Sequence, residues 1–398
     1  MNTMLTLKRR QFLVSATGTA MLGVSGATVS ATSASAQDQS TNLPGYADWK
    51  RPGAMIRHSE LTLETERAAI GTGVVTPNDV FFVRNNLTPP EAAATAGDDW
   101  EVQIEGVAEP ATRTLGELKR MGMDSVATII QCSGNGRGFH DHEASGSPWL
   151  TGAAGCAVWT GVPVRDIVEA HGGVSDGAQF MTSTGGEDLP EDVDRDEVVV
   201  ERSVPLKEME NAILAYEMNG EPIPLAHGGP VRMIVPGYYG VNNVKYVDRL
   251  AFTPEESKAN IMTSGYRVRP VGESGAPDQP TMWDMKVKSW IIHPLKDSET
   301  GQVHIYGVAF GGTNPVEKVE VSTDGGSNWQ EARLIGPDLG RYAWRTFVLA
   351  ADLEAGQHTL ASRATDSEGN VQESTTEPNH RAYDYAGWDR LAVDVTIA

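Results

Sequence analysis

The stretch Gln131-Cys132-Ser133-Gly134-Asn135-Gly136-Arg137-Gly138 follows the apolar run Val126–Ile130. The apolar run predicts a buried strand, so Cys132 stands at a strand end, before a glycine-rich turn that contains an arginine. A cysteine thiolate is a soft metal ligand, and glycines let the backbone approach a bulky ligand closely. The stretch therefore predicts a cofactor anchored by Cys132.

The beginning of the chain indicates export. Lys8-Arg9-Arg10-Gln11-Phe12-Leu13-Val14 places paired arginines before an apolar run, and Ala34-Ser35-Ala36 resembles a small-residue cleavage signal. Paired arginines favour the twin-arginine export machinery, with a chance Arg-Arg in an ordinary secretory signal as the alternative. We therefore predict a twin-arginine signal at residues 1–36 and a soluble periplasmic protein. No later stretch is long and apolar enough to predict a membrane span.

The chain is strongly acidic, with a formal net charge of −21 at pH 7. Such a surface repels nucleic acid and attracts basic proteins in a salt-dependent way. An adaptation to a salty habitat is an equally simple explanation of the charge. Nucleic acid is therefore excluded as a partner, and a basic protein is not.

The chain has two cysteines, and their surroundings differ. Cys156 lies in the apolar stretch Gly155–Trp159, which is typical of an inert buried thiol. A Cys132–Cys156 disulfide is the alternative in an exported protein, and it would contradict a cofactor on Cys132.

Residues 37–280 are predicted to form a first, mixed α/β domain. Leu115–Met121 and Val164–His171 have the apolar spacing of short amphipathic helices, whereas Ala92–Asp99 is predicted to be a loop. The acidic segment Glu187–Glu201 is predicted to be a solvated surface segment.

Residues 281–398 follow the turn-rich linker Val271–Pro280 and have a purely β pattern. Asp324-Gly325-Gly326 is a hairpin signal between strands. Short alternating runs predict an immunoglobulin-like sandwich, and the whole chain an α+β fold. The predicted strands of this part include Val303–Val308, Val316–Ser322, Tyr342–Leu349 and His358–Asp366.

Four features together resemble the sulfite oxidase (sulfite dehydrogenase) family of molybdenum enzymes. They are Phe82-Val83-Arg84-Asn85-Asn86, the cysteine stretch, Tyr238–Arg249 and the C-terminal β region. Cys132-Ser133-Gly134-Asn135-Gly136-Arg137 matches a Cys-Ala-Gly-Asn-x-Arg pattern except at Ser133. The segment from Gly307 to Gly326 resembles part of the family's dimerisation domain, and this resemblance implies a homodimer.

The resemblance implies that Cys132 is the one protein ligand of a molybdenum ion carried by molybdopterin. Thiolate is a suitable soft donor for that metal. Arg84 and Arg137 would bind a small sulfur oxyanion as cationic forks, and Tyr266 would donate a hydrogen bond to it. Two-electron oxygen transfer would then convert sulfite to sulfate.

The resemblance also implies a set of cofactor-binding residues. Arg232 and Lys245 would bind the phosphate, His227 the ring system, and Asp188 the pterin N–H groups. Asn86 stands where the family has a histidine, which places the identity of the substrate in doubt. The complete set is Phe82, Asn85, Asn86, Asp188, His227, Arg232, Asn243, Val244 and Lys245.

The chain has neither a Cys-x-x-Cys-His nor a His-Pro-Gly-Gly haem-binding segment, so no haem is expected. Electrons would pass to a separate protein, such as a basic c-type cytochrome. One alternative keeps the cofactor but acts on another sulfur oxyanion or a protein-bound sulfane. Two others are a zinc hydrolase using His140-Asp141-His142-Glu143 and a non-enzymatic exported binding protein.

Overall fold

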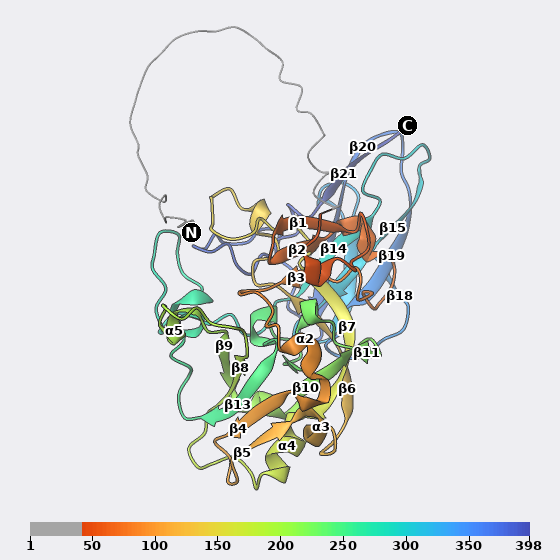
Figure 1. Cartoon of the computed structure of the whole chain (residues 1–398). Coiled ribbons are helices and arrows are strands. Elements are labelled where there is room, and N and C mark those ends of the chain that lie inside the picture. Colours follow the sequence, from red (N-terminus) through yellow and green to blue (C-terminus); the bar gives the residue numbers. More distant parts are fainter. Residues whose placement is uncertain (1–41) are drawn as a thin grey trace, which may run out of the picture. The chain divides into compact units, whose positions relative to one another are not determined.

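The computed structural model describes residues 42–398, and the predicted signal at residues 1–36 lies outside them. Strands dominate the described part of the chain, and its α-helices are seven residues long or shorter (Figure 1). No helix in this part has the length and apolar character needed to cross a membrane. The predicted mixture of strands and helices is therefore confirmed in part: both are present, but strands make up most of the regular structure. The α-helices are α2 (Ala93–Ala96), α3 (Leu115–Leu118), α4 (Val164–Ala170) and α5 (Arg195–Val198).

The cysteine stretch leaves the edge strand of a five-stranded sheet. The predicted strand is confirmed, because Val126–Ile130 lies within β6, which becomes fully buried toward its C-terminal end. β6 pairs antiparallel with β7, with Gln131 opposite Ala154, so Cys132 follows directly after the ladder. The strands of this sheet are β6 (Asp124–Gln131), β7 (Ala154–Pro163), β10 (Ile213–Met218), β11 (Glu221–Pro222) and β12 (Arg232–Ile234).

A second five-stranded sheet has the order β5-β4-β13-β8-β9. Its inward side chains share one apolar core with those of β10 and β12, which joins the two sheets. A smaller sheet, β1-β2-β3, ends at Arg84. The bounds are β4 (Glu101–Glu105), β5 (Ala111–Thr114), β8 (Phe180–Gly185), β9 (Glu201–Pro205) and β13 (Val247–Thr253), then β1 (Met55–Ser59), β2 (Thr62–Thr65) and β3 (Val83–Arg84).

The helix predictions are confirmed in part. α4 matches the predicted helix at Val164–His171, whereas α3 covers only the first turn of Leu115–Met121. α3 begins with a capping box, in which the Thr114 hydroxyl accepts from the Glu117 N–H and the Glu117 carboxylate accepts from the Thr114 N–H. The prediction of a loop at Ala92–Asp99 is wrong, because α2 and a 3₁₀ turn fill it.

The prediction that Glu187–Glu201 is a solvated surface segment holds for its middle, where residues 188–195 are exposed or half-buried, but not for its two ends. Both terminal carboxylates are buried, with Glu187 8% exposed and Glu201 7% exposed. Between them lies α5, and Glu201 begins β9. Charge density alone does not predict these buried ends. Glu187 lies near Lys245, and Glu201 is bound by Arg249 as well as by the local Arg195, so both ends contact cations that are distant in the sequence.

The C-terminal part contains two antiparallel four-stranded sheets, ordered β14-β15-β19-β18 and β17-β16-β20-β21. Side chains from both sheets form one core, which includes Ile305 and Phe347 from one and Val319 and Leu360 from the other. The predicted hairpin joins β16 to β17, while the immunoglobulin-like topology stays a prediction. The bounds are β14 (Lys288–His293), β15 (Gln302–Phe310), β16 (Val316–Ser322), β17 (Gln330–Glu331), β18 (Arg333–Ile335), β19 (Arg345–Asp352), β20 (Gly356–Asp366) and β21 (Val393–Ile397).

The segment predicted as a linker contains no helix or strand, but it is bound to the preceding residues. Arg269 donates to the Glu273 carbonyl at 2.9 Å, and Arg267 donates to the Gln279 carbonyl at 2.9 Å. Arg67, far from the linker in sequence, donates to the carbonyls of Ile291 and Leu391. Residues on both sides of the predicted boundary at 280 are therefore in contact, and that boundary stays a prediction.

Candidate functional site

A cavity that encloses about 620 Å³, its open mouth included, lies beside the end of β6. Residues from the cysteine stretch, the β3 strand and the segment before β13 line it, and most of the predicted site residues are among them. The lining residues are Phe81, Phe82, Arg84, Asn85, Asn86, Ile130, Cys132, Ser133, Glu187, Val200, Arg232, Gly240, Val241, Asn243, Val244, Lys245 and Tyr266.

The loop that carries Cys132 is held by main-chain and amide hydrogen bonds. The Cys132 N–H donates to the Ala153 carbonyl at 2.9 Å, and its carbonyl accepts from the Asn135 N–H at 2.9 Å. The Asn135 side chain accepts from the Ala153 N–H and donates to Gln131. Gly136 has φ of 103°, a left-handed conformation, and an added Cβ would meet the Tyr385 ring. The turn therefore orients the thiol rigidly.

Cys132 and Cys156 are both free thiols, so the alternative Cys132–Cys156 disulfide is not present. Cys156 is fully buried opposite Ile129, and burial raises the pKa of its thiol to about 12. This environment agrees with the predicted inert thiol.

Three cationic side chains line the cavity. Burial lowers the pKa of Lys245 well below its ordinary value and lowers the pKa of Arg232 to about 10. Lys245 binds the Ala226 carbonyl and the Asn85 amide oxygen, while Arg232 binds the carbonyls of Asn243 and His227. Burial would lower the pKa of Arg84, but the neighbouring Tyr266 and Cys132 raise it overall. Three cationic side chains around one cavity are costly to bury when Glu187 is the one carboxylate among its lining residues, which favours an anionic occupant.

Four buried polar atoms of the cavity lining have no hydrogen-bond partner among the described residues. They are Arg84 Nη1, Asn85 Nδ2, Ser133 Oγ and Glu187 Oε2. A buried polar group without a partner requires an explanation, and a polar ligand supplies one. Thiolate, cationic donors, amide and carboxylate together match the metal, phosphate and ring N–H groups of molybdenum–molybdopterin. The residues present therefore fit this cofactor.

Two predicted cofactor contacts lie outside the cavity lining. Asp188 is exposed, and its neighbour Glu187 lines the cavity instead, near Lys245.

His227 is 1% exposed and does not line the cavity, but its carbonyl accepts from Arg232, which does. Its Nε2 is 2.7 Å from the ammonium of Lys50, which also donates to the carbonyls of Asn78 and Phe81. Sequence reasoning missed both Glu187 and Lys50.

Glu187 gives the site a testable pH dependence. Burial raises the pKa of its carboxyl to about 7. The folded protein therefore retains a proton that the unfolded chain releases, and stability is lost as pH rises from about 4.5 through 7. In cofactor-free protein, Glu187→Gln should reduce the loss in free energy of unfolding between about pH 4 and about pH 8 by up to about 3 kcal/mol.

Urea unfolding at both pH values measures this effect, with the exposed Glu191→Gln as the control of equal charge change. An unchanged pH dependence in Glu187→Gln would show that the buried carboxyl does not carry it.

A stacked pair of tyrosines borders the cavity. The Tyr266 ring lies 5.3 Å from the Tyr383 ring at an interplanar angle of 5°. Tyr383 comes from the C-terminal region and is held by Asn379, whose amide binds both its N–H and its carbonyl. Ala382 and Asp384 on either side have positive φ of 48° and 61°. Such strained backbone persists where surrounding contacts determine it, as at functional sites.

Arginines surround this tyrosine pair. The guanidinium carbons of Arg137 and Arg381 lie 5.6 and 5.8 Å from the Tyr383 ring centroid, and that of Arg202 lies 5.7 Å from the Tyr266 ring. Arg137 donates to the Arg381 carbonyl through Nε and to the Ser147 carbonyl through Nη1. Arg137 thus ties the cysteine stretch to the C-terminal segment and is not among the cavity-lining residues, so its predicted contact with substrate stays a prediction.

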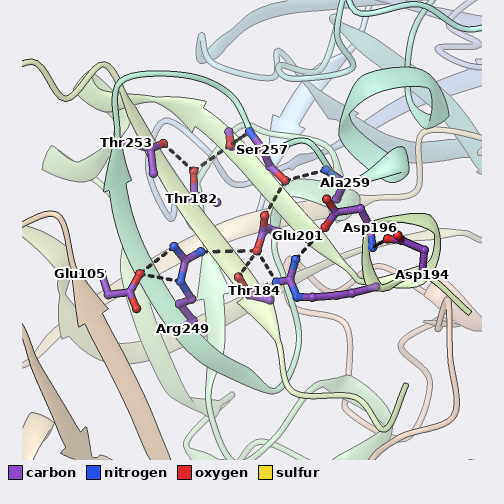
Figure 2. A network of polar contacts seen from close by, with 12 residues as sticks. Glu105, Thr182, Thr184, Asp194, Asp196, Glu201, Arg249, Thr253, Ser257 and Ala259 are labelled. Carbon is purple, nitrogen blue, oxygen red and sulfur yellow. Dashed lines mark hydrogen bonds and ion pairs between the residues drawn. The ribbon is translucent and has the colours of Figure 1, made fainter. Parts of the chain in front are cut away.

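A polar network supports the strand and the segment that lead to Tyr266 (Figure 2). Glu201 accepts from Ser257, Thr184, Arg195 and Arg249, and Arg249 also binds Glu105. Burial would raise the pKa of Glu201, but the hydrogen bonds from Ser257, Arg195 and Thr184 lower it overall. This network joins β4, β8, β9 and β13 to Ser257.

The next residue, Arg202, extends this support to the site. It is 1% exposed and donates to Asn242 Oδ1 and to the Ile261 carbonyl beneath Tyr266. The position of Tyr266 therefore depends on residues from several strands.

The alternative zinc site is not supported. The rings of His140 and His142 are 5.4 Å apart, but His142 Nε2 lies 2.9 Å from the Asn379 carbonyl. Within residues 42–398, no group of three or more His, Cys, Asp or Glu side chains is placed to hold a metal ion.

Comparisons with known proteins agree with the cofactor that fits the cavity. Residues 88–261 match the model of the oxidoreductase molybdopterin binding domain, and residues 279–396 match that of the Mo-co oxidoreductase dimerisation domain. The chain is 31% identical to human mitochondrial sulfite oxidase over 378 residues, which are 86% of this chain and 67% of that protein.

Chicken sulfite oxidase is 31% identical over 366 residues, covering 86% of this chain and 78% of that protein. A chain in the crystal structure of the sulfane dehydrogenase SoxCD from Paracoccus pantotrophus superposes with a TM-score of 0.72 at 27% identity. That match covers 86% of this chain and 89% of that chain.

Proposed function

The chain belongs to the sulfite oxidase family of molybdopterin-dependent oxidoreductases, and from this premise we propose that it oxidises sulfite to sulfate. The observation that carries the proposal is the placement of Cys132 and the unpartnered Arg84 Nη1 in one buried cavity. The thiolate is a metal ligand, and the guanidinium binds an oxyanion beside it.

When bound, molybdenum–molybdopterin supplies oxygen-atom transfer and accepts two electrons. Cys132 would hold the metal, Arg232 and Lys245 the phosphate, and Glu187 with Asn85 the ring system. Arg84 would bind and orient the sulfite oxygens, and the Tyr266 hydroxyl would donate a hydrogen bond to the same anion. Most of the lining residues are buried, which lowers the effective dielectric around Arg84 and strengthens its attraction for an anion.

The reaction converts sulfite and water to sulfate, two protons and two electrons. We propose that a separate one-electron acceptor such as a c-type cytochrome receives the electrons. The paired arginines near the N-terminus support export to the periplasm by the twin-arginine machinery. The match to a dimerisation domain supports a homodimer.

A second candidate substrate is a protein-bound sulfane, favoured by the structural likeness to the sulfane dehydrogenase SoxCD. Asn86 also lines the cavity at the position where the resemblance places a histidine. An amide donates and accepts hydrogen bonds but carries no charge, so substrate preference can differ from that of the sulfite enzymes.

Steady-state assays on the exported protein test the proposal. We expect near-stoichiometric molybdenum and ferricyanide reduction that depends on sulfite, with a higher kcat/KM for sulfite than for thiosulfate or a sulfane-loaded carrier protein. A higher kcat/KM for the sulfane-loaded protein would contradict the sulfite proposal and favour the second candidate substrate. Stoichiometric zinc without molybdenum would contradict both, and absence of either metal would favour a non-enzymatic binding protein.

A further inference from the structure

A second, larger hollow lies in the C-terminal part of the chain and encloses about 2190 Å³, its open mouth included. Six carboxylates and two basic side chains line it. Of the basic residues, Lys286 is paired with Asp384 at 2.6 Å. The exposed carboxylates Asp284, Glu368, Glu373 and Glu377 form no ion pair among the described residues. We call this hollow the acidic groove.

The acidic groove also contains exposed apolar surface. Val371 is 48% exposed among these carboxylates, and Val268 and Pro270 lie along the same lining. A small apolar centre surrounded by charge is typical of the surface at which a transient protein partner docks. Long-range attraction by the charges raises the association rate, and the apolar contact permits close approach.

The stacked tyrosines connect the acidic groove to the cofactor cavity. Tyr266 lines the cavity, Tyr383 lines the groove, and their rings are 5.3 Å apart and nearly parallel. A second connection runs through Asp384, a groove residue that accepts a hydrogen bond from the Tyr239 hydroxyl. Tyr239 precedes Gly240, which lines the cavity. A protein docked in the groove would thus be separated from the cavity by one pair of aromatic rings.

We propose that the acidic groove is the docking surface for the electron acceptor, a small basic one-electron haem protein, and that the Tyr266–Tyr383 pair lies on the electron path. The proposal rests on the proposed function. For each substrate oxidised, two ferric acceptors each accept one electron and leave as ferrous proteins. The two protons of the reaction go to solvent. The tyrosines serve as the medium between donor and acceptor and undergo no net change.

The first test compares two charge-matched double variants of the cofactor-loaded enzyme, with basic cytochrome c as the probe. Glu373→Gln/Glu377→Gln removes two exposed groove carboxylates. Glu101→Gln/Glu109→Gln removes two exposed carboxylates with no hydrogen-bonded partner, in and beside β4 of another sheet. At low ionic strength the groove variant should lower kcat/KM for cytochrome c at least about tenfold, and the control should change it little.

Calorimetric titration with ferricytochrome c should show the same weakening of binding, and added salt should remove the difference between the variants. Ferricyanide reduction by sulfite should stay at the wild-type rate in both. Equal losses in groove and control variants, or no loss in either, would overturn the proposal. A groove variant that becomes monomeric in light scattering would instead identify the groove as an interface between copies.

A second test addresses the tyrosine pair by stopped-flow reoxidation of the sulfite-reduced enzyme. Tyr383→Leu removes the stacked ring and should slow cytochrome c reduction inside the preformed complex, whereas Tyr383→Phe retains the ring and should stay near the wild-type rate. Equal rates of cytochrome c reduction in the two variants would show that the tyrosine pair does not lie on the electron path. If wild-type protein does not reduce ferricyanide with sulfite, the proposed function fails, and the calorimetric titration still tests the groove.

Discussion

Cys132→Ser should lower sulfite-dependent ferricyanide reduction by more than about a hundredfold, since the loss of a metal ligand should exceed that from removing an outer-shell partner. The hydroxyl of serine is a poor donor to a soft metal site and stays protonated at neutral pH. The hydrogen bonds that shape the loop use the main chain of residue 132 and the Asn135 amide, so the fold should remain. Molybdenum content per protein should be measured beside activity.

Cys156→Ala is the matched control. Cys156 is fully buried on β7 and is not among the residues that line the cavity. This variant should retain its molybdenum and its turnover while losing some stability through a small cavity. Full activity in Cys132→Ser, or equal loss in both variants, would refute the assignment of Cys132 as the metal ligand.

Arg84→Gln should lower kcat/KM for sulfite by about 10²–10³-fold, the range seen when one preorganised donor to a developing anion is removed. Arg84 is the cavity cation with a buried, unpartnered Nη1, which leaves it available for substrate. Its molybdenum content should stay near the wild-type value, because Arg232 and Lys245 remain. Arg84→Lys should recover part of the loss, since an ammonium keeps the charge but not the planar fork.

Arg51→Gln serves as the control for Arg84. Arg51 is an exposed arginine paired with Asp79, and the loss of such a surface pair should have little effect on turnover. Steady-state kinetics with sulfite and ferricyanide, together with metal analysis, separate the two variants. An unchanged kcat/KM in Arg84→Gln would remove this residue from the substrate site.

Local sequence predicts the strands of this chain better than it predicts which side chains line the cavity. Val126–Ile130 and Val316–Ser322 were recognisable because β-branched runs between turn signals are a local property. The loop at Ala92–Asp99 was mispredicted because alanines with no apolar periodicity carry little signal for a one-turn helix. The burial of Glu187 and Glu201 could not be inferred, because their cationic neighbours Lys245 and Arg249 come from a distant part of the chain.

Short contiguous motifs were enough to indicate the family, the metal-binding candidate Cys132 and the cationic set around it. Packing in three dimensions was needed to show that Glu187 rather than Asp188 faces the cavity, that Lys50 contacts His227, and that Arg137 binds main-chain carbonyls. It also brought Tyr383 from the C-terminal region onto Tyr266. These contacts join residues separated by as many as 244 positions in the chain, as with Arg137 and Arg381. The packing of whole sheets sets such contacts, and no local pattern encodes them.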